Sequence, residues 1–186
     1  MVGMRVIAGS AKGRRLKSPQ GPVRPTTELV RGAIFSILQP MFGDRWQALD
    51  LYAGSGALGI EALSRGASWV DFVESNARCC AVIKENLALT GFESRAKVYC
   101  CSVNKALSIL HEVYNVVMLD PPYSDVSFVD TLRNLLASHL VGAGSTVIVQ
   151  WSSHQTLSPD IGRFHLSKVR HYGDTCLSFY RQEANN

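Results

Sequence analysis

The sequence predicts an α/β fold: a doubly wound, mostly parallel sheet of seven strands, with an antiparallel C-terminal hairpin and a small N-terminal extension. Two observations lead to this prediction. From Trp46 onward, short β-prone apolar runs alternate with segments of helical periodicity, the pattern of a parallel sheet covered by crossover helices. The last two β-prone runs, 164–171 and 175–181, are joined by a short turn around Gly173-Asp174. That turn is too short for a parallel crossover, so we expect one strand to be reversed.

The segment before Trp46 has its own signals. Residues 4–8 and 13–17 are short extended stretches that predict a small hairpin. Residues 18–25 are rich in Pro and Gly and are expected to be irregular. A helix is expected to begin at Pro25-Thr26-Thr27-Glu28, where a threonine cap precedes an acid in the first turn, and to end near Pro40.

The alternating part of the chain is expected to hold five strands and four helices before the closing hairpin. The strands are expected at 48–53, 69–74, 96–100, 115–120 and 146–151, and the helices at 57–65, 76–90, 103–111 and 127–139. We expect residues 1–40 to form a basic extension that packs on the core, and residues 41–186 to form the catalytic domain. A chain of 186 residues is long enough for one full hydrophobic core.

The composition is that of an ordinary globular protein. Hydrophobic residues make up 46% and charged residues 18%, and no apolar run approaches the ~20 residues of a membrane span. The N-terminus lacks the apolar segment of a signal peptide. The five cysteines are an odd number without a C-x-x-C spacing, which predicts reduced thiols in a cytoplasmic protein that holds no metal.

The net charge of +4 is unevenly distributed. Residues 1–31 carry seven basic side chains against one acid, Glu28, and the rest of the chain is slightly acidic. The basic residues of this arm are Arg5, Lys12, Arg14, Arg15, Lys17, Arg24 and Arg31. Such a segment is either a solvated surface or a contact surface for the phosphates of a nucleic acid.

A glycine-rich motif predicts a cofactor site. Gly54, Gly56 and Gly59 satisfy G-x-G-x-x-G between a predicted strand and a predicted helix, where glycine allows a tight turn and close approach of a ligand. About 20 residues on, Glu74 ends the next strand and is expected to bind ribose hydroxyls. A dinucleotide and S-adenosylmethionine both carry that ribose. Asp50, just before the turn, favours S-adenosylmethionine, because a carboxylate suits its cationic end better than a pyrophosphate.

A second motif, Asp120-Pro121-Pro122-Tyr123, follows the apolar run 116–119. It is suited to hold a flat base that carries an exocyclic amine. The Asp120 carboxylate and the Pro121 carbonyl accept the two N–H groups of the amine, Pro122 brings no competing N–H, and the Tyr123 ring lies against the base. In a doubly wound sheet this motif and the glycine turn both fall at the carboxyl ends of strands, so they face the same crevice.

Together these features resemble the bacterial small-subunit rRNA guanine-N2 methyltransferases, the RsmD-like family of class I, Rossmann-like, S-adenosylmethionine-dependent enzymes. The resemblance spans almost the whole chain. Besides the two motifs it rests on Arg5-Val6-Ile7-Ala8-Gly9, Gly13-Arg14-Arg15-Leu16, Arg24-Pro25-Thr26-Thr27 with Arg31 and Phe35, and Tyr172-Gly173-Asp174-Thr175. The arm and the C-terminal Tyr-Gly-Asp-Thr are the parts most specific to this family.

The resemblance implies transfer of a methyl group from S-adenosylmethionine to guanine N2 in 16S rRNA, free or within a partly assembled small subunit, with S-adenosylhomocysteine as product. The implied cofactor-binding residues are Asp50, Tyr52, Gly54, Ser55, Gly56, Glu74, Ser75, Ser102, Arg24 and Thr26. The implied RNA contacts are Arg5, Lys12, Arg14, Arg15, Lys17 and Arg31. Three positions depart from the family pattern: Gly32 and Gln150 stand where a Glu is usual, and Ser102 where an Asp is common.

Other functions fit part of the pattern. A DNA or RNA methyltransferase acting on adenine N6 or cytosine N4 would use the same amine-binding motif. An NAD-dependent oxidoreductase would explain the glycines and Glu74 but leave Asp120 without a role. A catalytically silent RNA-binding assembly factor would use only the basic arm.

Overall fold

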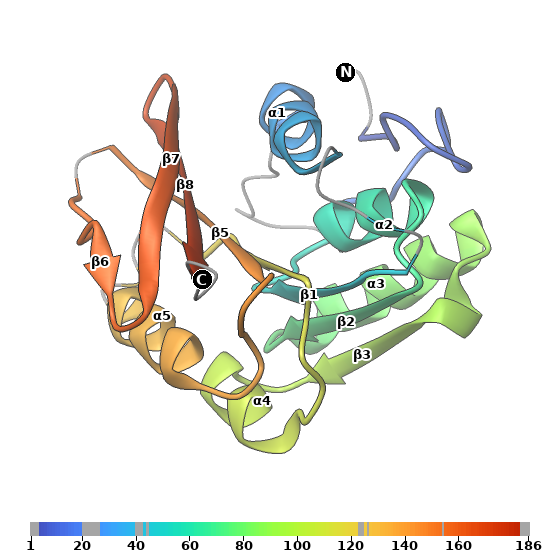
Figure 1. Ribbon diagram of the computed structural model, residues 1–186. Coiled ribbons are helices and arrows are strands. Elements are labelled where there is room, and N and C mark those ends of the chain that lie inside the picture. The colour runs from blue at the N-terminus through green and yellow to red at the C-terminus, as the bar shows by residue number, and fades with distance from the viewer. Residues whose placement is uncertain are drawn as a thin grey trace.

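The computed structural model describes residues 4–19, 27–39, 43, 45–122, 125, 127–153 and 155–182. Its centre is an eight-stranded sheet with the strand order β3-β2-β1-β4-β5-β8-β7-β6 (Figure 1). The strands are β1 (Gln47–Leu51), β2 (Trp69–Glu74), β3 (Ala96–Cys100), β4 (Val116–Leu119), β5 (Thr146–Ser152), β6 (Asp160–Ile161), β7 (Phe164–Tyr172) and β8 (Thr175–Gln182).

The topology confirms the predicted mostly parallel sheet. Strands β1 to β5 pair in parallel with one another, and β8 runs antiparallel between β5 and β7. Each expected strand lies within two residues of its predicted bounds. The two-residue strand β6 was not predicted, because two residues are too few to show a periodic pattern in the sequence.

Helices cover both faces of the sheet. They are α1 (Glu28–Leu38), α2 (Ala57–Ser64), α3 (Ala77–Thr90), α4 (Val103–Ile109) and α5 (Phe128–Ala137), with a 3-10 turn, η2 (Glu93–Arg95). The apolar side chains of α1, α2 and α3 share one core cluster, and those of α4 and α5 share a second cluster on the opposite face. We call these the α1 face and the α5 face. Residues alternate between them along the parallel strands, so Ala48 lies on the α1 face and Leu49 on the α5 face.

The predicted N-terminal hairpin is present and is held against α2. Its strands pair through Val6 N–H to the Arg14 carbonyl (3.0 Å), and Val6 is buried in the core of the α1 face. The carboxylate of Glu61 on α2 accepts the backbone N–H groups of Ile7 (2.8 Å) and Ala8 (3.0 Å). A Cβ atom at Gly9 would lie 1.8 Å from a carbonyl oxygen of α2, so only glycine fits this contact. The hairpin is therefore part of the packed structure and not a solvated tail.

The start of α1 follows the prediction, since the Thr27 hydroxyl accepts the N–H of Val30. The five cysteines are free thiols, as expected. Within the residues that the structure describes, no helix has both the length and the apolar character needed to span a bilayer.

Candidate active site

The turn after β1 has a backbone conformation that explains its glycines. Gly54 and Gly56 have φ angles of 56° and 78°, a region that L-residues rarely adopt. Tyr52, with φ of 60°, is the one non-glycine residue of the described chain in that region, and such strain concentrates at functional sites. Gly59 is needed for another reason. A Cβ atom there would lie 2.2 Å from the ring of Phe72, so α2 could not approach the sheet as closely.

Glu74, at the end of β2, orders this turn. Its Oε2 accepts the N–H of Gly54 and its Oε1 accepts the N–H of Asn76, both at 2.8 Å. Each carboxylate oxygen has a second lone pair, so the half-buried Glu74 keeps acceptor capacity for a ribose. Ser75 follows it on the surface. The ribose contact stays a prediction. The structure shows that the same side chain also orders the backbone of the glycine turn.

Asp50 is a buried carboxylate beneath the turn. Its Oδ2 accepts the N–H of Gly59 at 2.8 Å, while its Oδ1 has no hydrogen-bond partner in the described part of the chain. Burial raises the pKa of Asp50 well above its ordinary value, and the negative charges of Asp120 and Glu74 raise that pKa further, although the Gly59 hydrogen bond opposes them. Three carboxylates thus share the carboxyl edge of the sheet.

This cluster fits a cationic ligand better than an anionic one. A bound positive charge would relieve the mutual repulsion of the carboxylates, whereas a pyrophosphate would add to it. The orphaned Oδ1 of Asp50 and the spare acceptor capacity of Glu74 are the groups that would face the cationic amino-acid end and the ribose of S-adenosylmethionine. This set of carboxylate acceptors therefore fits that cofactor and disfavours a dinucleotide.

The amine-binding motif begins at the same edge. The backbone N–H of Asp120 lies 3.4 Å from the carbonyl of Leu51, which places the end of β4 beside the end of β1. Asp120 is half-buried, Pro121 is buried and Pro122 is exposed. The carbonyl of Pro122 accepts the N–H of Asp125 at 2.8 Å. Tyr123, the predicted stacking residue, lies outside the described residues.

A link between the two motifs was not predicted. The hydroxyl of Tyr52 donates to the carboxylate of Asp125 at 3.3 Å, and Asp125 also accepts the N–H and hydroxyl of Ser127. Burial raises the pKa of Tyr52, so its hydroxyl stays a donor. Tyr52, predicted as a cofactor contact, is thus placed to hold the loop after β4 against the glycine turn. The sequence shows that residue 125 is an aspartate, but it does not show that its partner is Tyr52.

Asn86 on α3 is a second residue that sequence reasoning missed. It is fully buried, its Oδ1 accepts the N–H of Lys17 (2.7 Å), and its Nδ2 donates to the carbonyls of Lys17 (3.0 Å) and Ser55 (2.9 Å). Met4 approaches the Ser55 hydroxyl from the same arm, with Sδ and Oγ 3.6 Å apart. The basic arm is therefore joined directly to the glycine turn. The Ser55 carbonyl accepts from Asn86 and the Ser102 hydroxyl caps α4, so both residues have structural roles, and their cofactor contacts stay predictions.

The predicted RNA contacts separate into two groups. The exposed side chains of the arm are Arg5, Lys12, Arg14, Arg15 and Lys17. Arg31 is fully buried instead. Its Nη2 donates to the carbonyl of Arg5 at 2.8 Å, and burial lowers its pKa although Glu61 and Glu28 favour the charge. The prediction that Arg31 contacts RNA is therefore wrong for this structure, because a side chain without exposed surface cannot reach a phosphate. Arg24 and Thr26 lie outside the described residues.

The raised pKa of Asp50 predicts a pH-dependent stability. The folded protein holds a proton on Asp50 more tightly than the unfolded chain does. The free energy of unfolding therefore falls as pH rises from the pKa of Asp50 in the unfolded chain, about 3.9, through its raised pKa in the folded protein. Asp50→Asn removes this loss. We expect the melting temperature of the variant, relative to wild type, to increase with pH in the cofactor-free protein, while S-adenosylmethionine binding weakens. Parallel melting-temperature profiles for Asp50→Asn, wild type and the exposed control Glu93→Gln would contradict the assignment.

Comparison with known proteins agrees with this geometry. Residues 4–181 match the model of the family described as Conserved hypothetical protein 95. The chain is 33% identical to the putative rRNA methyltransferase YlbH of Bacillus subtilis, covering 97% of this chain and 100% of that protein. It is also 33% identical to ribosomal RNA small subunit methyltransferase D of Escherichia coli K12, covering 97% and 91%.

A solved structure described as the putative methyltransferase yhhF from Escherichia coli superimposes with a TM-score of 0.87 at 29% identity, covering 98% of this chain and 99% of that one. The glycine turn and the amine-binding motif thus occur in a fold shared over nearly the whole length. The chain belongs to the family described as Conserved hypothetical protein 95, whose members include YlbH and small subunit methyltransferase D and which consists of Rossmann-like methyltransferases.

Proposed function

We propose that this protein transfers a methyl group from S-adenosylmethionine to the exocyclic N2 of a guanine in 16S rRNA. The observation that carries the proposal is the placement of Asp120 beside the glycine turn, where its charge acts on the buried Asp50. Binding groups for a cationic cofactor and for an amine thereby meet at one edge of the sheet. The relative from Escherichia coli, whose name gives the small-subunit rRNA as its substrate, supports the choice of RNA.

Positioning dominates the chemistry of this site. S-adenosylmethionine supplies a methyl group on a positive sulfonium, which is already a good leaving group. The protein therefore has to hold the amine nitrogen in line with that methyl, and needs no strong base to start the reaction. Asp120 and the Pro121 carbonyl orient the two N–H groups. The carboxylate stabilises the positive charge that develops on nitrogen as the N–C bond forms and the S–C bond breaks, and one N–H proton then leaves through Asp120 to water. The target guanine must leave its stack in the RNA to reach the site, and the Tyr123 ring would then stack on it.

The rest of the site keeps these groups in register. Glu74 fixes the glycine turn, and Tyr52 ties the loop after β4 to it through Asp125. The arm supplies exposed cations to the RNA backbone, and Asn86 joins the arm to the turn. Part of this charge is already used within the protein, since Arg5 pairs with Glu28 (3.2 Å) and Lys17 with Glu85 (2.8 Å). Both pairs are exposed and so are weak enough to exchange for phosphates.

The test is methyl transfer from tritiated S-adenosylmethionine to 16S rRNA and to small-subunit particles, both from cells lacking this protein, followed by nucleoside mass spectrometry. We expect N2-methylguanosine in at least one of the two substrates and no label in 23S rRNA, the matched control. Label in N6-methyladenosine or N4-methylcytosine would assign the alternative base. RNA binding without label would favour a silent assembly factor, and tighter binding of NADH than of S-adenosylmethionine would overturn the reaction class.

A further inference from the structure

Strand β7 carries two exposed cations that the site described above does not use. Lys168 and Arg170 are both solvent-exposed. Neither makes an ion pair with any described residue, and the guanidinium of Arg170 contacts only the neighbouring backbone carbonyl of Val169, at 3.0 Å. Two unpaired cations two residues apart on a strand point to the same side of the sheet. Their charge is therefore available to an outside partner.

A β-bulge decides which side that is. Leu166 pairs with Tyr180, and both pack on the α5 face, whereas Lys168 pairs with Phe179, which belongs to the α1 face. The extra residue, Ser167, caps the irregularity by donating its hydroxyl to the Phe179 carbonyl at 2.9 Å. Without the bulge, strict alternation would send Lys168 to the α5 face with Leu166. The bulge instead turns Lys168 and Arg170 toward the face that carries the basic arm.

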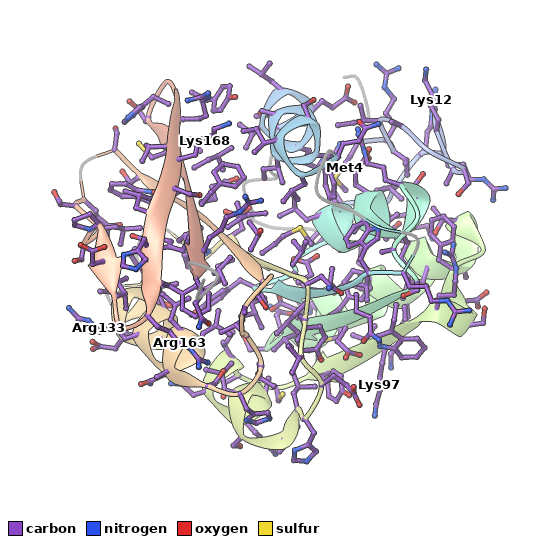
Figure 2. The ribbon with its side chains drawn as sticks, viewed as in Figure 1. Met4, Lys12, Lys97, Arg133, Arg163 and Lys168 are labelled. Atoms are coloured by element: carbon purple, nitrogen blue, oxygen red, sulfur yellow. The ribbon has the colours of Figure 1, made fainter. Side chains whose placement is uncertain are left out.

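The two cations and the arm lie on either side of α1. The arm packs against α2 and α3, while α1 shares a core cluster with Leu177 and Phe179 of β8, the partners of Arg170 and Lys168. Figure 2 shows Lys168 on one side of α1 and Lys12 on the other. The C-terminal end of β7 lies at the same edge of the sheet as the candidate site. Its last residue, Tyr172, pairs with Thr175, which also pairs with Ser152 at the carboxyl end of β5.

The outer surface of α1 between these charges carries no unpaired acid. After Glu28, its exposed or half-exposed residues are Leu29, Gly32, Ala33, Ser36 and Ile37, and none of them is charged. The single acid of the helix, Glu28, is paired with Arg5 of the arm. A polyanion crossing α1 would therefore meet cations at both sides, with Glu28, the partner of Arg5, as the one carboxylate of α1.

We propose that Lys168 and Arg170 form a second phosphate-contact surface, which binds the rRNA backbone across α1 from the N-terminal arm. This inference rests on the proposed RNA substrate and extends it. Two contact sites on opposite sides of α1 would hold the RNA over the helix. Phosphate contacts at both sites would then fix the position of the RNA relative to Asp120.

The test is a salt titration of binding to a 16S rRNA transcript between ~50 and ~200 mM salt. We expect Lys168→Ala/Arg170→Ala to lower affinity about tenfold and to flatten the log–log slope by roughly 1.4–1.8, the loss of two phosphate contacts. Lys168→Arg/Arg170→Lys should keep the wild-type slope, because it preserves both charges. The matched control is Lys97→Ala/Arg133→Ala, which removes one lysine and one arginine from exposed positions of β3 and α5, away from the α1 face (Figure 2).

The outcomes separate this inference from the proposed function. Melting temperature and S-adenosylmethionine binding should be unchanged in every variant of this series. Equal slopes and affinities for Lys168→Ala/Arg170→Ala and the control would overturn the second surface, even if alanine at Lys12, Arg14, Arg15 and Lys17 abolishes binding. Wild-type protein that shows no salt-dependent RNA binding at all would instead contradict the proposed substrate.

Discussion

Replacing Asp120 with Asn is expected to lower the rate of methyl transfer at least ~100-fold, the cost of losing one preorganised electrostatic contact in a site. Asn keeps the shape of the side chain and one acceptor oxygen, but it removes the anionic charge that stabilises the developing positive nitrogen. The measurement is single-turnover transfer from tritiated S-adenosylmethionine to the RNA substrate. Cofactor affinity should change much less than the rate, because Glu74 is the carboxylate that accepts the N–H groups of Gly54 and Asn76 and so orders the glycine turn.

The control for this result is Asp130→Asn, which removes an exposed carboxylate ten positions further along the chain, on α5. It should leave the rate within about twofold, because an exposed ion pair contributes little. Activity of Asp120→Asn within a few-fold of wild type would refute the assigned role of Asp120. A parallel loss of cofactor affinity and rate would indicate instead that this side chain belongs to the cofactor site.

Asn86→Leu is expected to destabilise the fold by about 2–4 kcal/mol and to weaken cofactor and RNA binding together. Leucine fills a similar volume but leaves three backbone groups without their partner: the N–H and carbonyl of Lys17 and the carbonyl of Ser55. Each buried polar group that loses its hydrogen bond costs about 1–3 kcal/mol, and partial access of water to the Lys17 backbone reduces the sum. The measurements are denaturant unfolding and calorimetric binding of S-adenosylmethionine to the folded fraction.

Two variants isolate the cause of that effect. Thr90→Val removes a buried hydroxyl one turn further along α3 that bonds only within its own helix, so it should cost about 1 kcal/mol or less and leave ligand binding intact. Lys17→Ala removes the exposed ion pair with Glu85 but keeps the backbone contacts to Asn86, so stability should change by less than about 1 kcal/mol. Equal destabilisation by Asn86→Leu and Thr90→Val would show that Asn86 does not join the arm to the turn.

The order of strands and helices could be predicted because it is carried by local signals. Alternating apolar runs, the helix cap at Thr27 and the short connection at Gly173 each act within a few residues, and the structure places the elements close to their expected bounds. The glycine motif was equally local, because Gly54 and Gly56 need a backbone region closed to most side chains. The C-terminal reversal followed from the shortness of the connection at Gly173-Asp174.

The candidate site was predictable only as a set of residue types at strand ends. Parallel strands bring their carboxyl ends to one edge, so the proximity of Asp50, Glu74 and Asp120 follows from the fold class. What each carboxylate does there depends on the groups around it. Glu74 binds two backbone N–H groups, and Asp50 has one oxygen paired and the other without a partner in the described chain. No spacing in the sequence records that difference.

The sequence by itself determined the α/β fold, the glycine turn and the position of the Asp120-Pro121-Pro122-Tyr123 motif, because short-range backbone preferences and hydrophobic periodicity depend on neighbouring residues. Only the tertiary structure decided that Arg31 is buried, that Asn86 joins the arm to the turn, and that a bulge before Lys168 turns β7 so that its cations face the α1 side. These outcomes depend on contacts between segments many residues apart. The burial and hydrogen-bond partners of a polar side chain are fixed by packing, which no local pattern encodes.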